Sequence, residues 1–385
     1  MSNRSGSIKS GIFFVLAVSI TILSFAVGCT SKKSNEILIG QFASLTGSEA
    51  TFGISTDEGV RMVIDEVNEK GGIKGRKIKL ITLDDQGKPE EAASVVTRLI
   101  EQHKVVALIG EVASTRSLAA APIAQAKKIP MISPSSTNPQ VTEVGDYIFR
   151  VCFIDPFQGE VMARFVIDHL KLKKVAVLRD LKSDYSVGLA NFFIKKFKEL
   201  GGEVLADLSY QAGDVDFKAQ LTQIKSLNPE GLYIPGYYTD VGLIARQARE
   251  LGIKVPLLGG DGWDSSKLFE IGGSAVENSY FSNHYSNESD DPLVKDFVKR
   301  YQEKYKKTPD GLAAQGYDAA KILVHVLESI DEITPQKIRD GLAQVKNFKG
   351  VTGVITIDEK RNAAKGAVIV QVKGQTNKYV TTINP

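Results

Sequence analysis

The sequence predicts an α/β protein with two lobes, each a doubly wound parallel sheet covered by helices on both faces. From Glu36 onward, apolar strands alternate with amphipathic helices, the pattern of βαβ units. The strands are short, uninterrupted runs rich in Val, Ile and Leu, as in sheets that are covered on both faces. The alternation runs in two series, and 385 residues are enough for two full cores.

The first series supplies the first lobe. Its expected strands are EILIGQF (36–42), KIKLITLDD (77–85), VVALIG (105–110) and IPMIS (129–133), and its expected helices are 56–70, 89–102 and 114–128. The first of these helices has Val60, Val63, Ile64 and Val67 at helical spacing. Gly71 and Gly72 then end that helix.

The second series supplies the second lobe. Its expected strands are 173–180, 203–210, GLYIPGYY (231–238) and 255–260, and its expected helices are 186–201, 214–227 and 240–252. The C-terminal third adds helical segments at 291–305, 311–330 and 334–345 and strand-like segments at 353–358 and 366–373. Neither lobe is complete without this last third.

The N-terminus has the features of a secretory signal. Arg4 and Lys9 precede an apolar run from Gly11 to Val27 that ends at Gly28-Cys29. A cysteine in that place resembles a bacterial lipoprotein box, although an alanine stands at position 26 where leucine is usual. We therefore expect a lipoprotein-type signal over 1–28, acylation of Cys29 and a polar tether over 29–35. A plain cleaved signal and a retained anchor helix remain alternatives.

Composition and motifs exclude several classes of function. The net charge of +3 is weak and no long run of like charge occurs, which argues against a nucleic-acid binder. None of the four histidines follows a strand of the two series, and the motifs of serine hydrolases, zinc proteases and zinc-binding Cys/His sets are missing. We therefore expect no enzyme, no cofactor and no metal. Cys152, with its apolar neighbours, is expected to be a buried thiol without a disulfide partner.

Candidate binding residues follow five of the expected strands. In open parallel sheets, ligands bind beyond the carboxyl ends of the strands. Ser114 and Thr115 open a helix, whose free N–H groups favour an anion, and Asp261 lies among glycines of the other lobe. Together they would suit a zwitterion. Taken singly, Ser114 could be an N-cap and Asp261 a turn residue, so the interpretation depends on their convergence.

Six segments, met in order along the chain, resemble the periplasmic branched-chain amino-acid binding proteins of ABC importers. They are IGQFASLTGSEATFG with the segment that follows it, IGEVASTRSLAAAPIAQ, IPMISPSSTNPQVT, YIFRVCFIDPFQG, YQAGDVDFKAQLTQIK and GYYTDVGLIARQARELG. The resemblance implies two lobes joined by three crossovers, with residues 36–155 and 285–362 in the first and 156–284 and 363–385 in the second. It also implies closure around the ligand by a hinge.

The resemblance assigns the polar contacts to four residues. Ser114 would bind the ligand carboxylate through its hydroxyl, helped by the backbone amide of Thr137. The main-chain oxygen of Ser135 and the side chain of Thr137 would receive the ammonium. Asp261 would neutralise that ammonium when the lobes close, although glutamate is frequent there in the family.

Aromatic residues would complete the site. Tyr185 and Tyr237 match the aromatics that cover the ligand, and Phe52 stands where an aromatic lines the side-chain pocket. Trp263, the only tryptophan, could either wall the pocket or pack at the hinge.

The resulting hypothesis is a monomeric, lipid-anchored receptor outside the cytoplasm that delivers an amino acid, branched-chain or otherwise apolar, to a membrane permease. The alternatives are a sensor of the same fold that does not take part in transport, and a receptor for an amide, urea or aromatic acid. An enzyme is the third class considered.

Overall fold

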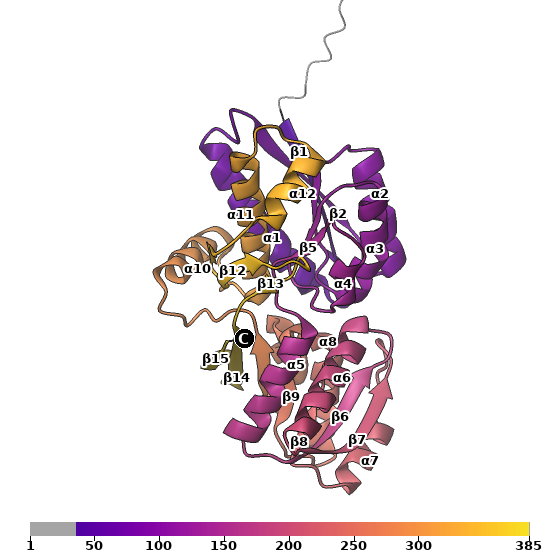
Figure 1. Ribbon diagram of the computed structural model, residues 1–385. Coiled ribbons are helices and arrows are strands. Elements are labelled where there is room, and N and C mark those ends of the chain that lie inside the picture. The colour runs from indigo at the N-terminus through magenta and orange to yellow at the C-terminus, as the bar shows by residue number, and fades with distance from the viewer. Residues whose placement is uncertain (1–35, 385) are drawn as a thin grey trace, which may run out of the picture. The chain divides into compact units, whose positions relative to one another are not determined.

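The computed structural model describes residues 36–384, so the predicted signal and tether lie outside the described residues. The first lobe is centred on a five-stranded parallel sheet in the order β2-β1-β3-β4-β5 (Figure 1). Its strands are β1 (Glu36–Ala43), β2 (Lys77–Asp84), β3 (Ala107–Ile109), β4 (Met131–Ser133) and β5 (Ile148–Arg150). The strand β1 lies inside the sheet, so the strand order reverses beside it, as in doubly wound folds.

The second lobe has a seven-stranded sheet in the order β15-β14-β10-β9-β8-β6-β7. Its strands are β6 (Lys174–Asp180), β7 (Glu203–Tyr210), β8 (Gly231–Tyr233), β9 (Leu257–Gly259), β10 (Tyr280–Asn283), β14 (Ala367–Lys373) and β15 (Thr376–Ile383). The strands β6, β7, β8, β9 and β10 are parallel, whereas β14 and β15 are added antiparallel at one edge. These findings confirm the predicted fold class of two parallel-sheet lobes.

Helices cover both faces of the first sheet. The helices α1 (Ala50–Glu69), α10 (Pro292–Tyr305), α11 (Gly311–Ser329) and α12 (Pro335–Ala343) share one hydrophobic core with Ile37 and Ile39 of β1. The helices α2 (Pro89–Glu101), α3 (Ser114–Ala126) and α4 (Gln140–Glu143) enclose a second core, against which Leu38 packs. Successive residues of β1 thus point to opposite buried faces.

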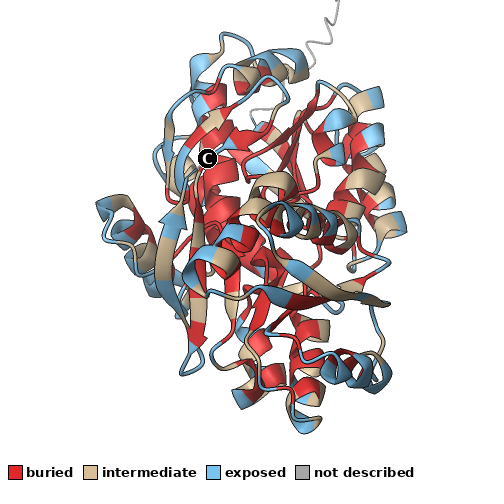
Figure 2. Cartoon of the chain, turned by 60° about the horizontal axis from the view of Figure 1, so that its bottom comes forward, coloured by how far each residue is buried: buried red, intermediate tan, exposed pale blue. Residues whose placement is uncertain are grey.

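The second sheet is covered in the same way. The helix α5 (Asp155–Arg164), its π-helical continuation η1 (Phe165–His169) and α6 (Asp184–Glu199) pack on one face. The helices α7 (Lys218–Ser226), α8 (Tyr238–Glu250) and α9 (Ser266–Gly272) pack on the other, together with the short turns η2 (Asp261–Trp263) and η3 (Gly273–Val276). Figure 2 shows the buried residues gathered on the strands and on the inward faces of the helices.

Within residues 36–384 the chain passes between the lobes three times. It leaves the first lobe between β5 and α5, returns between β10 and α10, and leaves again between β13 and β14. A small antiparallel sheet, β11 (Phe348–Gly350), β12 (Gly353–Ile357) and β13 (Ala363–Ala364), precedes the last passage. Each lobe therefore takes part of its structure from the C-terminal third.

Most of the predicted elements are present, with informative differences. The helix α1 begins at Ala50 rather than Thr56, because tertiary packing holds residues with low helix propensity such as Gly53. A Cβ at Gly53 would lie 2.1 Å from the Ser44 carbonyl oxygen. The predicted strand 231–238 ends at Tyr233, and Tyr238 already belongs to α8. The strands β5, β10 and β15 and the helix α5 have weak signals in the sequence and were not predicted.

Close packing of α1 on α11 depends on two glycines. A Cβ on Gly59 would lie 2.0 Å from the carbonyl oxygen of Ala313, and one on Gly316 would lie 2.4 Å from that of Thr56. Both obstacles are helix backbone, which cannot move aside as a flexible side chain can. The two helices can approach this closely only because neither position has a side chain.

We expect Gly59→Val to destabilise the protein by about 3 kcal/mol or more, because the added side chain forces α1 and α11 apart. The free energy of unfolding, measured with urea, provides the test. Arg61→Val places the same side chain on the exposed face of α1 and should cost about 1 kcal/mol or less. Equal stability of the two variants would contradict the proposed packing constraint.

Candidate functional site

Strand ends from the two lobes meet around one small cavity. The cavity is nearly closed in this structure, with a free volume of about 10 Å³, and is lined by Phe52, Val112, Ser114, Ser135, Tyr185, Tyr237, Asp261, Gly262 and Leu312. Six of these residues are among those that the sequence analysis singled out. The pattern of residues after parallel strands and the family resemblance together led to residues that lie close to one another in space.

The first-lobe side of the cavity includes the N-terminus of α3. Ser114 is the first residue of this helix, is 1% exposed, and accepts a hydrogen bond from the Asn138 amide at 3.2 Å through its Oγ. The amides of the first helical turn lack partners within the helix, and the helix dipole makes this end favourable for an anion. An anionic group in the cavity would meet both the hydroxyl and these amides.

A buried ion-pair network holds this helix end. The guanidinium of Arg116 contacts the Glu111 carboxylate at 2.8 Å and the Glu49 carboxylate at 3.0 Å. Glu111 also accepts hydrogen bonds from the Ala113 amide and from the Ser44 hydroxyl. The segments that follow β1 and β3 are thereby tied together beside the cavity.

The serine-rich loop after β4 divides into two groups. The hydroxyls of Ser133 and Ser136 donate to the Glu111 carbonyl at 2.7 and 2.9 Å, which fixes the loop from behind. Ser135 faces the cavity and donates to Gln315 Oε1 at 2.9 Å. Thr137 does not line the cavity: its buried hydroxyl lies beside the Asp155 carboxyl, and its carbonyl accepts from the Asp155 amide at 2.9 Å.

Aromatic side chains form the second-lobe wall. The rings of Tyr185 and Tyr237 stack in parallel with centroids 5.2 Å apart, and the Tyr185 hydroxyl accepts from the Gly262 amide at 3.2 Å. Phe52, from the first lobe, meets Tyr237 edge-on at 5.6 Å and Tyr238 at 5.0 Å. Burial raises the pKa of both wall tyrosines, Tyr185 and Tyr237, so both phenols stay protonated at neutral pH.

Asp261 provides the carboxylate of the cavity. It begins the short turn η2 directly beyond β9 and is 7% exposed. Gln158 Nε2 donates to its Oδ1 at 2.8 Å, and His284 Nε2 lies 3.0 Å from its Oδ2. Ser135 of the first lobe approaches the same Oδ2 at 3.5 Å.

Trp263 does not line the cavity, so its prediction as a ligand-binding residue needs correction. Its ring is fully buried in the second-lobe core, 5.9 Å from Phe281, and its indole Nε1 donates to the Ile234 carbonyl at 2.9 Å. The ring fills the space above Gly259, where a Cβ would lie 2.1 Å from it. Of the two roles considered, packing is the one that the structure supports.

Several residues of the site were not found from the sequence. Val112 and Leu312 line the cavity with apolar side chains, and Gln158 and His284 contact Asp261 from behind. Gln158 and Leu312 lie on helices, whose buried faces are dominated by ordinary packing residues. The position of His284 after β10 was a usable signal, but this strand was not predicted.

Direct hydrogen bonds join the lobes around the cavity. Thr51 Oγ1 lies 2.8 Å from Ser265 Oγ, and the Asp184 amide donates to Thr115 Oγ1 at 3.0 Å. The Asn138 side chain also reaches across and donates to the Asp184 carbonyl at 2.9 Å. The lobes are therefore in contact on both flanks of the cavity.

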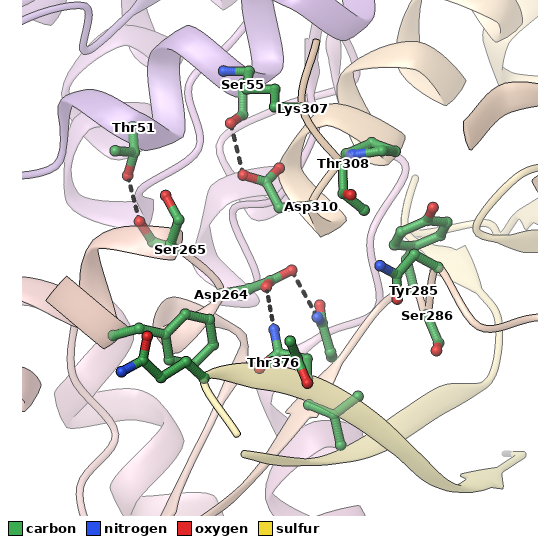
Figure 3. Close-up of a pocket in the computed structure, with 18 of the residues that line it drawn as sticks. Thr51, Ser55, Asp264, Ser265, Tyr285, Ser286, Lys307, Thr308, Asp310 and Thr376 are labelled. Atoms are coloured by element: carbon green, nitrogen blue, oxygen red, sulfur yellow. Dashed lines mark hydrogen bonds between the residues drawn. The ribbon is translucent and has the colours of Figure 1, made fainter. Parts of the chain in front are cut away.

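Figure 3 shows the flank beside Thr51 and Ser265, where the carboxylates of buried Asp264 and half-buried Asp310 lie near each other across the lobes. Asp264 accepts from the Gly311 amide at 2.6 Å and from Asn283 at 2.7 Å, and Asp310 accepts from the Ser55 hydroxyl at 2.7 Å. Burial, together with the charge of Asp264, raises the pKa of Asp310 to about 7.

Other features of the described residues limit the chemistry. Within residues 36–384, no cluster of three or more His, Cys, Asp or Glu side chains has metal-binding geometry, and no helix has the length and apolar character of a membrane span. Cys152 is a buried free thiol whose pKa is raised to about 12 by burial, which confirms the structural role predicted for it. The predicted apolar run 11–27 lies outside the described residues.

Two sheet lobes in contact around a small polar cavity define a receptor that encloses its ligand between them. The protein-family model described as "Periplasmic binding protein" matches residues 36–377, and the chain belongs to this family. The family is one of binding proteins, in agreement with the prediction that the chain is not an enzyme.

Several known proteins are similar to this chain. The leucine-binding protein LivK of Thermotoga maritima is 44% identical, with a TM-score of 0.87 over 91% of this chain and 99% of its own. LivJ of Streptococcus pneumoniae, solved with isoleucine, is 34% identical with a TM-score of 0.87 over 91% and 100%. The Leu/Ile/Val-binding protein homolog 1 of Brucella suis is 31% identical over 350 residues, 89% of this chain and 92% of the relative.

Asp155, at the first passage between the lobes, generates a prediction for pH dependence. It is fully buried, and burial, opposed in part by the Thr137 hydroxyl, raises its pKa to about 8. In the unfolded chain an aspartate releases its proton near pH 4. Between these values the folded state binds more protons, so the stability that protonated Asp155 provides is lost as the pH rises towards about 8.

Asp155→Asn should remove this loss, which amounts to at most about 1.4 kcal/mol per pH unit. Urea unfolding of both proteins between about pH 5 and about pH 8 measures the two slopes. The exposed Asp216→Asn serves as the control and should follow the wild type. Parallel slopes for the wild type and Asp155→Asn would show that the carboxyl is already ionised in the folded protein.

Proposed function

We propose that this protein is the substrate-binding receptor of an ABC importer and that its ligand is a branched-chain amino acid. The observation that carries the proposal is the polarity of the cavity between the lobes. A helix N-terminus with Ser114 lies on one side, the Asp261 carboxylate lies on another, and Phe52, Val112 and Leu312 add apolar surface. A small zwitterion with an aliphatic side chain matches all three parts.

The ligand carboxylate would bind at the N-terminus of α3. Ser114 Oγ would donate to it, and the backbone amides of the first helical turn and of Thr137 would add further N–H donors. Hydrogen bonds to a charged group contribute about 1.5–3 kcal/mol each, and the helix dipole contributes a further fraction of a kcal/mol to about 1 kcal/mol. This side of the cavity belongs to the first lobe, so it could hold the ligand before the lobes close.

The ligand ammonium would bind between Asp261, the Thr137 hydroxyl and the Ser135 carbonyl. Thr137 is buried and does not line the cavity in this structure, so its part in this contact is supported by the family resemblance alone. Asp261 belongs to the second lobe. Its attraction for the ammonium would therefore favour the closed arrangement over the open one.

The side chain of the ligand would meet Phe52, Val112 and Leu312, with Tyr185 and Tyr237 covering it. The small cavity has no charged group besides Asp261 in its lining, which supports an aliphatic side chain over a charged one. The relatives named Leu/Ile/Val-binding protein and LivK, and LivJ with its isoleucine, support the same class of ligand.

We further propose that the chain is exported and anchored by a lipid on Cys29, with residues 29–35 as a tether. The basic and apolar pattern before Cys29 supports this, as does membership of a periplasmic binding family. The lobes would comprise residues 36–155 with 285–362 and 156–284 with 363–385. A monomer that hands its ligand to a permease fits this arrangement.

A sensor of the same fold would bind the same ligand without transport. The two functions differ in cells, where deletion of the gene should abolish uptake of labelled leucine if the protein serves an importer. Unchanged uptake at low leucine concentration would favour the sensor. The strain must lack any redundant leucine receptor that could mask the effect of the deletion.

The ligand poles can be tested by two substitutions. Ser114→Ala and Asp261→Asn should each weaken leucine binding by about 1–3 kcal/mol, because each leaves a charged group of the ligand without a partner. Calorimetric titration gives the affinities, and exposed Ser226→Ala and Asp216→Asn are matched controls. Wild-type affinity in both site variants would refute the assignment.

Ligand identity can be tested by thermal unfolding across all amino acids and small amides. A ligand that binds only the folded state should stabilise it by about 2.7 kcal/mol at 100 times its Kd. Leucine, isoleucine or valine should give the largest shift. A shift with urea or an aromatic acid, and none with any amino acid, would replace the proposed ligand class.

Lipid attachment has its own test. Expressed in bacteria with a labelled fatty acid, the wild type should carry the label and sediment with membranes, whereas Cys29→Ala should do neither. Cys152→Ala is the control, because this buried thiol should not affect acylation. Labelling of Cys29→Ala would place the lipid elsewhere.

A further inference from the structure

Two side chains outside the cavity lining hold the two oxygens of the Asp261 carboxylate. Oδ1 accepts from Gln158 Nε2 at 2.8 Å, and Oδ2 is 3.0 Å from His284 Nε2. Both residues are buried almost completely, at 0% and 2% exposure. Buried donors of this kind restrict a carboxylate to one orientation, since any rotation would break a hydrogen bond that water cannot replace.

Gln158 reaches Asp261 from the first passage between the lobes. It lies one turn into α5, the helix that begins directly after that passage. Its Nε2 also lies 3.0 Å from Ser282 Oγ on β10, so its amide group is fixed from two sides. The amide also packs tightly against Gly260, because a Cβ on that glycine would lie 2.8 Å from Gln158 Nε2.

His284 reaches Asp261 from the second passage. It follows the last residue of β10, and its ring stacks on Phe153 of the first passage with centroids 3.6 Å apart. Burial lowers the pKa of His284 to about 4, so the imidazole is neutral at physiological pH. An ionised carboxylate can only accept, so the proton of the neutral ring must be on Nε2.

The donors to Asp261 therefore orient the carboxylate without neutralising it. Among the described residues, its direct side-chain contacts are an amide, a neutral imidazole and a hydroxyl, with no lysine or arginine. A cationic partner in this place would cancel the charge that a ligand ammonium needs. Neutral donors leave that charge available, and their fixed positions reduce the ordering cost on binding.

We propose that His284 and Gln158 are positioning residues for ammonium recognition, which hold the Asp261 carboxylate in the orientation that the ligand meets. The inference rests on the proposed function, since it requires a ligand ammonium at Asp261. Gln158, His284 and Asp261 all belong to the second lobe, so the carboxylate is already oriented within that lobe before the ligand arrives.

The test compares His284→Phe, which keeps a ring to stack on Phe153 but has no donor, with His284→Gln, which keeps an N–H at similar reach. His284→Phe should weaken leucine binding about 10-fold or more, and His284→Gln should remain within about 3-fold of the wild type. Titration calorimetry gives the affinities. Exposed His325→Phe on α11 is the matched control and should bind as the wild type does.

A double-mutant cycle separates positioning from a general structural effect. In an Asp261→Ala background, His284→Phe should change leucine affinity less than about 3-fold, because the group that it positions is gone. An equal loss in both backgrounds would overturn the proposal. If His284→Phe does not fold, Gln158→Leu in the same two backgrounds gives the same comparison.

The outcomes also distinguish this inference from the proposed function. If the wild type binds no amino acid, the proposed function fails. If the wild type binds leucine and Asp261→Ala weakens it, but His284→Phe and Gln158→Leu bind as the wild type does, only the positioning role fails.

Discussion

The constraint on which the rest of the site depends is the removal of an ionised carboxylate from water. A buried charge is costly unless it is hydrogen-bonded or paired. At Asp261 the protein supplies hydrogen bonds and withholds a cation, so the chain itself leaves the pairing incomplete. The aromatic wall, the small cavity and the contacts between the lobes all increase the cost of this incomplete pairing, because each excludes water that would otherwise screen the charge.

The two lobes contribute unlike parts to this arrangement. The first lobe presents a helix N-terminus, whose partial positive charge comes from backbone amides and does not depend on pH. The second presents a carboxylate and aromatic rings on short segments beyond its strands. Two of the three passages between the lobes adjoin residues that hold this carboxylate, since Gln158 follows the first passage closely and His284 precedes the second.

Sequence patterns identified the site residues that follow strands. They did not identify the residues on other elements that contact them. Ser114, Tyr185, Tyr237 and Asp261 were accessible because the carboxyl ends of parallel strands meet at one edge of a sheet. Gln158 and Leu312 could not be predicted in this way, because they lie on helices. Only the packing of segments distant in sequence brings them to the site. Trp263 shows the reverse error, because proximity in sequence to Asp261 does not determine which way a ring points from a tight turn.

The position of Trp263 gives the protein an internal optical reporter. It is the only tryptophan in the chain, and it lies in the same short turn as Asp261, fully buried and bonded to the Ile234 carbonyl. Its fluorescence therefore comes from a single site in a dry environment, two residues from the carboxylate that closure engages. A shift of that turn would change the emission directly, so lobe movement could be followed in the unlabelled native chain.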